Sequence, residues 1–247
     1  DVSPFDIFPK KQKAKTLHQL IGDLPALEEM GEISEDIFHA YREFDQRMLP
    51  WIENLDEGQS AFEQTDELRI PHRIIDGKLV PNKSKNGDKY ARWYWEKEGP
   101  CVHTRNDILS SQNTVHPKDN RVFSIRELMR MMSIPDSFEW SNIKTKDLNE
   151  RTDLEKKLFL KKEELNIRHC LGEAVPTGVF KNIASNIKNF YKKEKISSPE
   201  IKSIIEENKL NITENLIHYI KENFKNLSLE NIFLIAEFSN SERQETS

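Results

Sequence analysis

Glycine is scarce in this chain, and its few glycines do not form a phosphate-binding loop. Only 8 of the 247 residues are glycine, less than half of the ~7% that is usual in globular proteins. A nucleotide-binding fold needs glycines at fixed spacing where the backbone approaches the phosphates. No such spacing occurs here. The sequence therefore argues against a self-sufficient enzyme built on a phosphate- or dinucleotide-binding fold.

The composition is that of a folded protein without a membrane segment. Hydrophobic residues make up 36% of the chain, enough for a sizeable core, and no apolar run approaches the ~18 residues of a spanning helix. Two cysteines, Cys101 and Cys170, are too few for a disulfide framework and are not spaced for zinc. We expect an intracellular protein with no metal site and no membrane partner.

Charge is unevenly distributed along the chain. Residues 1–68 carry 6 Lys and Arg against 16 Asp and Glu, residues 69–130 carry 13 against 7, and residues 131–247 carry 18 against 19. A basic stretch of this kind is typical of a protein that binds a polyanion. The alternative is an ordinary solvated charged face.

Hydrophobic periodicity and turn signals predict an α+β fold, in which a small β-rich module is flanked by helices and followed by a helical C-terminal part. Asp76-Gly77 favours a hairpin between residues 73–75 and 78–80. Ser124 and Glu127 form a capping-box pattern that predicts a helix start. Further helices are expected at residues 16–20, 34–44, 141–168, 177–193, 199–208, 213–224 and 228–238, and further strands at 92–95 and 101–104.

Two segments have specific patterns. The first is residues 121–138, RVFSIRELMRMMSIPDSF, and the second is residues 167–176, IRHCLGEAVP. In this order they resemble the ninth and tenth sequence blocks of DNA (cytosine-5)-methyltransferases, which run R-x-L-T-x-R-E-x-x-x-L/M-x-x-x-P-D-x-F and G-N-A-V-P. The residues that match the ninth block, and to which we assign a structural role, are Arg121, Arg126, Glu127, Pro135 and Asp136.

The resemblance implies that the second segment contributes to a cofactor-binding pocket. In the family the tenth block lines part of the S-adenosylmethionine pocket, which by position falls on Gly172, Glu173, Ala174 and Val175. Glu173 stands where the family commonly has Asn, and a carboxylate can accept but not donate a hydrogen bond. On spacing alone, a helix-capping turn is the simpler interpretation of this segment.

The chain lacks the residues with which the family performs its reaction. The chemistry needs a thiolate that attacks an extruded cytosine, and a held methyl donor. The sequence contains no F-x-G-x-G loop, no Pro-Pro-Cys-Gln, no Glu-Asn-Val and no Gln-x-Arg-x-Arg. Cys101 follows a proline, but its other neighbours do not match, so we interpret it as a structural thiol. We assign no catalytic residue and expect the chain alone to be inactive, either as a natural split subunit or as the C-terminal part of a longer protein.

The segment before the ninth block is the target-recognition domain in this family, and residues 69–115 occupy that position. Phosphate contacts are expected from Lys83, Lys85, Lys89 and Arg92. Base readout is expected from a polar run comprising His103, Thr104, Arg105, Asn106, Ser111, Gln112 and Asn113. The alternative is a surface loop capped by its own side chains.

Together, these expectations predict a division of the chain into four segments and a function for it. Residues 1–45 form a connector with short helices, 46–123 the target-recognition domain, 124–195 helices that dock on a catalytic domain, and 196–247 a helical extension. The predicted role is DNA recognition and completion of the cofactor pocket in a cytosine-5 methyltransferase of a prokaryotic restriction-modification system, in the cytoplasm. The expected partners are duplex DNA and the missing catalytic domain or subunit. The alternatives are a DNA-binding module without a methylation role and a helical interaction protein.

Overall fold

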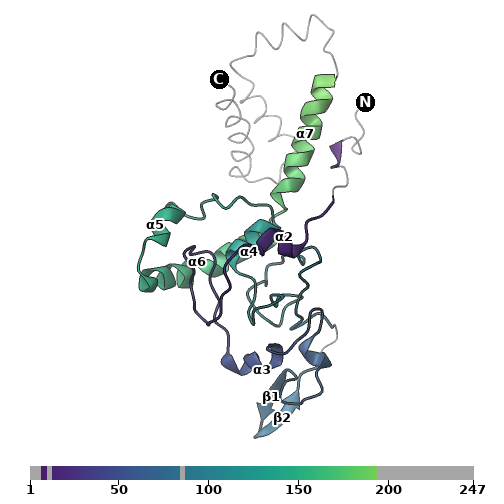
Figure 1. Ribbon diagram of the computed structural model, residues 1–247, viewed down its shortest axis with the longest axis vertical. Coiled ribbons are helices and arrows are strands. Elements are labelled where there is room, and N and C mark those ends of the chain that lie inside the picture. The colour runs from purple at the N-terminus through teal and green to yellow at the C-terminus, as the bar shows by residue number, and fades with distance from the viewer. Residues whose placement is uncertain (1–6, 10–12, 84–86, 194–247) are drawn as a thin grey trace, which may run out of the picture. The chain divides into compact units, whose positions relative to one another are not determined.

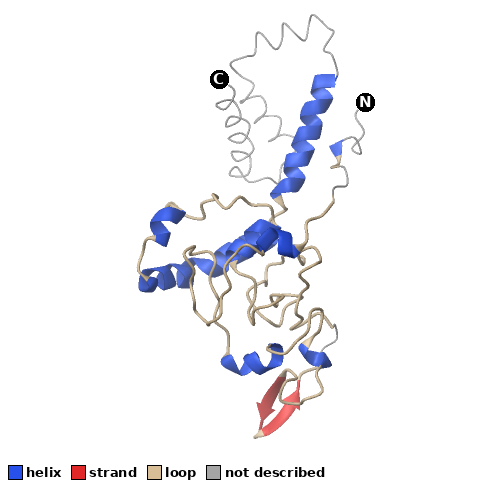
Figure 2. Cartoon of the chain, in the orientation of Figure 1, coloured by secondary structure: helices blue, strands red, loops and turns tan. Residues whose placement is uncertain are grey.

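The computed structural model describes residues 7–9, 13–83 and 87–193 (Figure 1). Contacts divide the chain into two units, Asp1–Ile187 and Lys188–Ser247, and the following account concerns the first. The described elements are α2 (Leu17–Ile21), η1 (Gln46–Met48), α3 (Leu49–Ile52), η2 (Ala61–Glu63), β1 (His72–Ile75), β2 (Lys78–Pro81), α4 (Ile125–Met131), α5 (Thr145–Asn149), α6 (Asp153–Glu173) and α7 (Thr177–Lys193), of which α7 continues past Ile187. Helices together with a small antiparallel sheet confirm the α+β class (Figure 2).

Capping boxes set the starts of three α-helices. In each, a Ser or Thr side chain accepts from a backbone N–H three residues on, and the side chain at that position bonds back to the cap. The pairs are Thr16 with Gln19, Ser124 with Glu127, and Thr152 with Glu155. The predicted helix start after Ser124 is therefore confirmed.

The predicted hairpin is confirmed as β1–β2. Its register places Arg73 opposite Val80 and Ile75 opposite Lys78. The turn residues have positive φ values, 49° at Asp76 and 72° at Gly77. A tight hairpin turn of the type favoured by the strand twist requires this geometry, and an Asp-Gly pair tolerates it.

Four predicted elements of secondary structure were wrong. The single helix expected at residues 141–168 is divided into α5 and α6, and residues 141–144 and 150–152 are not helical. Residues 34–44 form turns and an isolated bridge instead of a helix, because the Asp36 side chain accepts from the backbone N–H of Phe38 and so competes with helical bonding. Residues 92–95 and 101–104 are not strands. The N–H groups of Arg92 and Trp93 bond to the carbonyls of Gln59 and Val115, in two different segments, so no continuous ladder forms.

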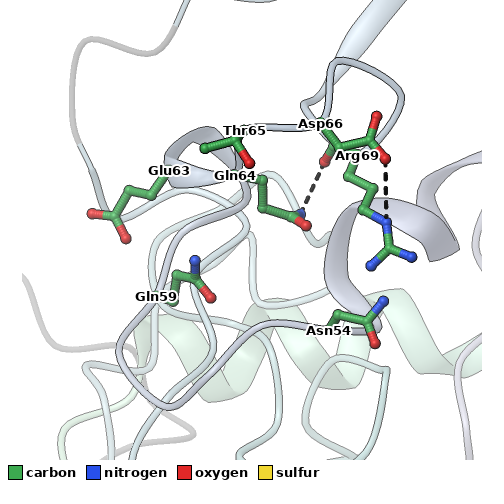
Figure 3. Close-up of a pocket in the computed structure, with 7 residues that line it drawn as sticks. All are labelled: Asn54, Gln59, Glu63, Gln64, Thr65, Asp66 and Arg69. Carbon is green, nitrogen blue, oxygen red and sulfur yellow. Dashed lines mark hydrogen bonds and ion pairs between the residues drawn. The ribbon is translucent and has the colours of Figure 1, made fainter.

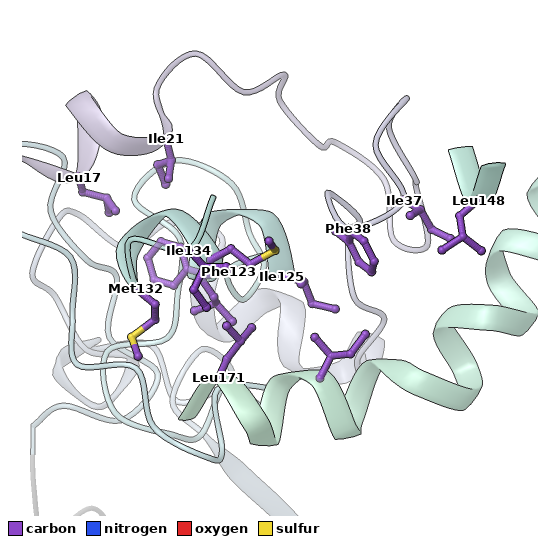
Figure 4. Close-up of a cluster of buried hydrophobic side chains, with 13 residues drawn as sticks. Leu17, Ile21, Ile37, Phe38, Phe123, Ile125, Met132, Ile134, Leu148 and Leu171 are labelled. Carbon is purple, nitrogen blue, oxygen red and sulfur yellow. The ribbon is translucent and has the colours of Figure 1, made fainter. Parts of the chain in front are cut away.

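Two hydrophobic clusters hold the unit together. The α4 core gathers residues from α2, α4, α5, α6 and the loops beside them (Figure 4). Its members are Leu17, Ile21, Ile37, Phe38, Phe123, Ile125, Leu128, Met129, Met132, Ile134, Leu148, Ile167 and Leu171. The Trp51 core lies around α3 and η2 and contains Trp51, Ile52, Leu55, Ala61, Tyr90, Leu109, Val115 and Val122.

Helix α6 buries a different face from the one that its leucines suggest. Leu154, Leu158 and Leu165 are exposed, whereas Ile167 and Leu171 enter the α4 core. The helix is therefore packed mainly through its C-terminal half, which contains the second of the two matched segments.

The remaining predictions concern the membrane and the C-terminal helices. No helix in the described part of the chain is long and apolar enough to cross a bilayer. The helices expected at residues 199–208, 213–224 and 228–238 lie outside the described residues. The four segment boundaries stay a prediction.

Candidate functional site

The two segments that match sequence blocks pack against each other. Leu171 from the end of α6 shares the α4 core with Leu128 and Met132. Just beyond, the N–H of Thr177 donates to the carbonyl of Met132 at 3.1 Å, and the Thr177 hydroxyl donates to the carbonyl of Ser133. Residues 121–138 and 167–177 thus form one packed surface.

A buried charge cluster anchors the N-terminus of α4. The Arg121 guanidinium donates to both carboxylate oxygens of Glu127 at 2.8 Å and to Asp119 at 2.9 Å. Glu127 also accepts from the backbone N–H of Ser124 at 2.6 Å. Burial works to raise the pKa of Glu127, but Arg121 and then His116 outweigh it, so the pKa lies well below its usual range. The pair is ionised and fixes the segment before α4 to the helix.

His116 lies beside this cluster as a neutral ring. Its Nδ1 accepts from the backbone N–H groups of Lys118 and Asp119 at 3.3 and 3.0 Å, which leaves the proton on Nε2, 3.5 Å from Glu127. Burial is the main cause that lowers the pKa of His116 from 6.5 to about 4. The ring therefore completes the cluster without adding charge at neutral pH.

Arg126 connects two segments to α4. Its guanidinium donates to the Asp36 carboxylate and, at 2.8 Å, to the carbonyl of Asp136, while its backbone N–H donates to the carbonyl of Phe38 at 2.9 Å. Pro135 and Asp136 are exposed at the turn that follows α4. Arg126 thus ties the residues before and after α4 to the helix, and the structural role expected for the first segment stays a prediction.

Gly172 lies in close contact with the polar run that precedes the first segment. A Cβ built at this position would lie 2.3 Å from the N of Thr104 and 2.4 Å from the carbonyl carbon of His103. The helix and the loop backbone therefore meet without an intervening side chain, for which only glycine is small enough. Glu173, Ala174 and Val175, by contrast, are exposed.

Arg168, one turn earlier in α6, holds the same loop. Its Nη1 lies 3.2 Å from Oδ1 of Asn106, and Nδ2 of Asn106 donates to the Arg168 carbonyl at 2.9 Å. Glu164 accepts from Nε of Arg168 at 2.8 Å and forms an ion pair with Arg42. Arg168 and Asn106 are 1% and 3% exposed, so these bonds are shielded from water. Asn106 thus serves to fix the loop, which differs from the base-reading role expected for it.

Four of the other predicted residues lie together at the surface. Nε2 of His103 is 3.2 Å from the carbonyl of Gln112, and the Ser111 hydroxyl is 3.4 Å from the same ring. Lys89 pairs with Gln112 through an isolated bridge. Lys89 and Gln112 are exposed, while His103 and Ser111 are partly so. The loop therefore brings a cation, an imidazole, a hydroxyl and an amide together.

Two more residues of the run lie next to this group in sequence. Arg105 is exposed, and its Nε donates to Asp107 at 2.9 Å. Asn113 has a positive φ of 53° and donates its N–H to the carbonyl of Asp88. Asn adopts this conformation more readily than most residues. Asn113 therefore also serves to shape the backbone of the loop. Thr104 is half-buried against Gly172.

Of the four residues expected to contact phosphates, Arg92 is inside the protein. It is 4% exposed, and its guanidinium donates to the carbonyls of Ile52, Leu55, His116 and Asp119 and to the side chain of Asn120. These five bonds join loops, which differs from the phosphate contact expected from the sequence. Lys83 and Lys89 are exposed, and Lys85 lies outside the described residues.

A polar depression of about 370 Å³ lies elsewhere, near α3 and η2 (Figure 3). Its lining residues are Asn54, Gln59, Glu63, Gln64, Thr65, Asp66 and Arg69, with Arg69 paired to Asp66 at 3.6 Å. None of the predicted site residues lines it, and we assign it no role.

The sequence analysis missed the contribution of Arg168. The residue stands between Ile167 and Leu171, both apolar and on one face of a helix, which is a signal that it faces the interior. Its buried partner Asn106 is 62 residues away in sequence. Only the fold reveals the pairing.

Comparison with known proteins gives the family. Residues 3–189 match the family described as C-5 cytosine-specific DNA methylase. The chain is 30% identical over 190 residues to the Type II methyltransferase M1.HgaI of Avibacterium volantium, covering 73% of this chain and 46% of that protein. It is 23% identical over 176 residues to the Type II methylase M.HgiDII of Herpetosiphon aurantiacus, covering 71% and 44%.

The chain spans less than half the length of these two relatives. The family match, by contrast, extends over both block-like segments and the loop that they hold. The resemblance drawn from residues 121–138 and 167–176 is therefore confirmed at the level of the family, and the chain belongs to the C-5 cytosine-specific DNA methylases.

Proposed function

We propose that this chain is the DNA-recognition and cofactor-pocket-completing part of a cytosine-5 DNA methyltransferase of a restriction-modification system, acting in the prokaryotic cytoplasm. Residues 46–123 would recognise the target duplex, and the catalytic thiol would come from a domain or subunit outside this chain. The proposal is supported above all by one observation. The end of α6 fixes the polar loop at residues 103–113, which we call the readout loop, through Gly172 and Arg168. The residues proposed to contact the cofactor and those proposed to contact DNA are therefore held in a fixed arrangement.

The DNA-contacting group is proposed from exposure and chemistry. Lys83 and Lys89 are exposed cations that suit phosphate oxygens. Arg105 and Gln112 are exposed, with the donor and acceptor groups that recognise guanine and adenine edges in the major groove. His103 and Ser111 are available in part beside them. Asn106 and Arg92 support these residues from inside the protein.

Of residues 172–175, only the last three are proposed to contact the cofactor. The face of Gly172 where a Cβ would stand is filled by the His103–Thr104 backbone, so Gly172 fits a spacer better than a ligand contact. Glu173, Ala174 and Val175 are exposed and can form one wall of a pocket. S-adenosylmethionine, when bound, supplies the methyl group, and this chain's own residues contribute position and exclusion of water.

The proposed partner surface follows from exposed apolar side chains. Val175, Val179, Phe180 and Ile187 are between 38% and 59% exposed over the segment that begins α7. A patch of this kind marks a contact surface. The missing catalytic domain is the occupant that the proposal requires.

Two measurements on the purified chain test the proposal. Incubation with labelled S-adenosylmethionine and mixed-sequence duplex DNA should give no methyl transfer, and the chain should bind the duplex with an affinity that falls as salt rises. Methyl transfer by the chain alone would contradict the non-catalytic role. Absence of DNA binding at low salt would contradict the recognition role and favour a helical interaction protein.

A further inference from the structure

The β1–β2 hairpin carries a surface that the readout loop does not account for. Each pair of directly opposed residues in an antiparallel hairpin lies on one face, and successive pairs alternate between faces. One face therefore holds two pairs, Arg73 with Val80 and Ile75 with Lys78. All four residues are exposed. We call these four residues the ribbon face.

The hairpin is attached at its base, whereas Ile74, on the face opposite the ribbon face, is 68% exposed. The His72 ring packs edge-on against Trp51 of the Trp51 core, with the ring centroids 5.5 Å apart. The N–H of Asn82 donates to the carbonyl of Pro71 at 2.7 Å, and Leu79, on the same face as His72, is half-buried. The base is thus fixed, and the strands extend past α3 (Figure 1).

Each pair on the ribbon face joins a cation to a branched aliphatic side chain. Ile75 and Val80 are 49% and 41% exposed, and a two-stranded ribbon is only marginally stable alone in water. A partner that covers this face must accept positive charge and offer apolar contacts in alternation. Residues 69–83 carry four Lys and Arg against one Asp, a charge that suits an anionic partner.

Duplex DNA meets these requirements. Its major groove admits a two-stranded β-ribbon, its phosphates attract cations, and the methyl group of thymine gives an apolar contact. We propose that the ribbon face binds duplex DNA, with Arg73 and Lys78 on phosphates and Ile75 and Val80 against base edges. This proposal rests on the proposed function and adds a second DNA-contacting element to the loop that contains Arg105.

The test measures the salt dependence of DNA binding by the full chain. Binding of a mixed-sequence duplex is followed by fluorescence anisotropy for the unaltered chain and for the double variant Arg73→Gln, Lys78→Gln. Two lost phosphate contacts should lower the log–log salt slope by about 2 and weaken binding at least ~10-fold near physiological salt. The matched control is Lys157→Gln, Lys161→Gln on α6, which removes the same charge from exposed positions and should leave the slope unchanged.

A second variant tests the apolar half of the ribbon face. Ile75→Thr, Val80→Thr keeps β-branched residues in the strands, so the hairpin should persist, as a far-UV circular dichroism spectrum and an unchanged unfolding temperature would show. The salt slope should stay at its original value, while affinity falls about 3- to 10-fold through loss of contacts to base edges.

The outcomes separate the two proposals. If the unaltered chain binds with a steep salt dependence and the Arg73, Lys78 variant behaves like the control, the ribbon face does not contact DNA and the proposed function stands. That result would favour a protein partner for the hairpin. If the unaltered chain shows no salt-dependent binding, the recognition role itself is overturned.

Discussion

Arg168 and Asn106 hydrogen-bond each other in both directions across 62 residues of sequence. The guanidinium donates to the Asn106 side-chain oxygen at 3.2 Å, and the Asn106 amide donates to the Arg168 carbonyl at 2.9 Å. Both residues are buried. The pair therefore fixes the loop around residue 106 to helix α6.

Replacing Arg168 by Met should destabilise the protein. The variant keeps much of the side-chain volume but leaves Glu164 and Asn106 without their buried donor, which costs about 3 kcal/mol of unfolding free energy. Urea unfolding measures the loss, and amide hydrogen exchange should accelerate in residues 103–113. The control is Lys157→Met on the same helix, which is exposed and should change stability by less than ~0.5 kcal/mol. Equal stability of the two variants would contradict the assigned role.

Gly172→Ala should be far more damaging than Gly178→Ala. The new methyl group at residue 172 would lie 2.3 Å from a backbone atom of Thr104, whereas at residue 178 the nearest atom is the Ser133 hydroxyl at 3.3 Å. Overpacking against backbone costs about 1–3 kcal/mol, or more where neither segment can move. Thermal unfolding of the two variants checks the difference. A similar melting temperature for both would show that the loop can withdraw from α6.

Breaking the ion pair at the start of α4 should strongly destabilise the protein. Glu127→Gln leaves the buried Arg121 charge without its bidentate partner, a loss of about 3–5 kcal/mol. The same change at exposed Glu155, another capping-box residue, should cost no more than ~1 kcal/mol. Chemical unfolding measures both. The interpretation fails if the Glu127 variant is as stable as the Glu155 variant.

His116 should make the protein less stable as the pH falls from about 6.5 towards 4. Burial lowers the pKa of the folded-state ring from 6.5 to about 4, so in this window the unfolded chain binds a proton that the folded protein does not. Stability is therefore complete above pH 6.5 and declines by about 3 kcal/mol on acidification. His116→Gln should remove this part of the pH dependence. The matched change at exposed His169 should not, and a decline retained in the His116 variant would assign the effect to carboxylates.

Arg105→Ala should alter which sequences the assembled enzyme prefers. Under the proposed recognition role Arg105 reads a guanine, so its loss should reduce discrimination at one base pair by about 1–3 kcal/mol. Binding to a library of duplexes, with the catalytic part present, measures the preference. An unchanged preference together with unchanged affinity for the target duplex would remove Arg105 from the readout group.

Local sequence patterns correctly predicted the elements that are stabilised by interactions between residues close together in sequence. The Asp76-Gly77 turn and the Ser124 cap were found because the residues that form them are neighbours. The roles of Arg92 and Asn106 could not be found in this way, since the acceptors that surround each come from separate segments. The helix predicted at residues 34–44 was wrong for a related reason. Their apolar spacing suggests a helix, but the Asp36 side chain bonds the local backbone and Arg126.

If residues 103–113 read the target as proposed, the contact at Gly172 restricts how a new sequence specificity can be introduced. A graft of residues 103–113 from a relative would meet a helix surface shaped for one backbone path, since no side chain at residue 172 can yield to fit another. A workable exchange must therefore transplant the last two turns of α6, including residue 168, together with the loop. Under the proposed recognition role, the loop and the helix end that supports it would have to be exchanged together.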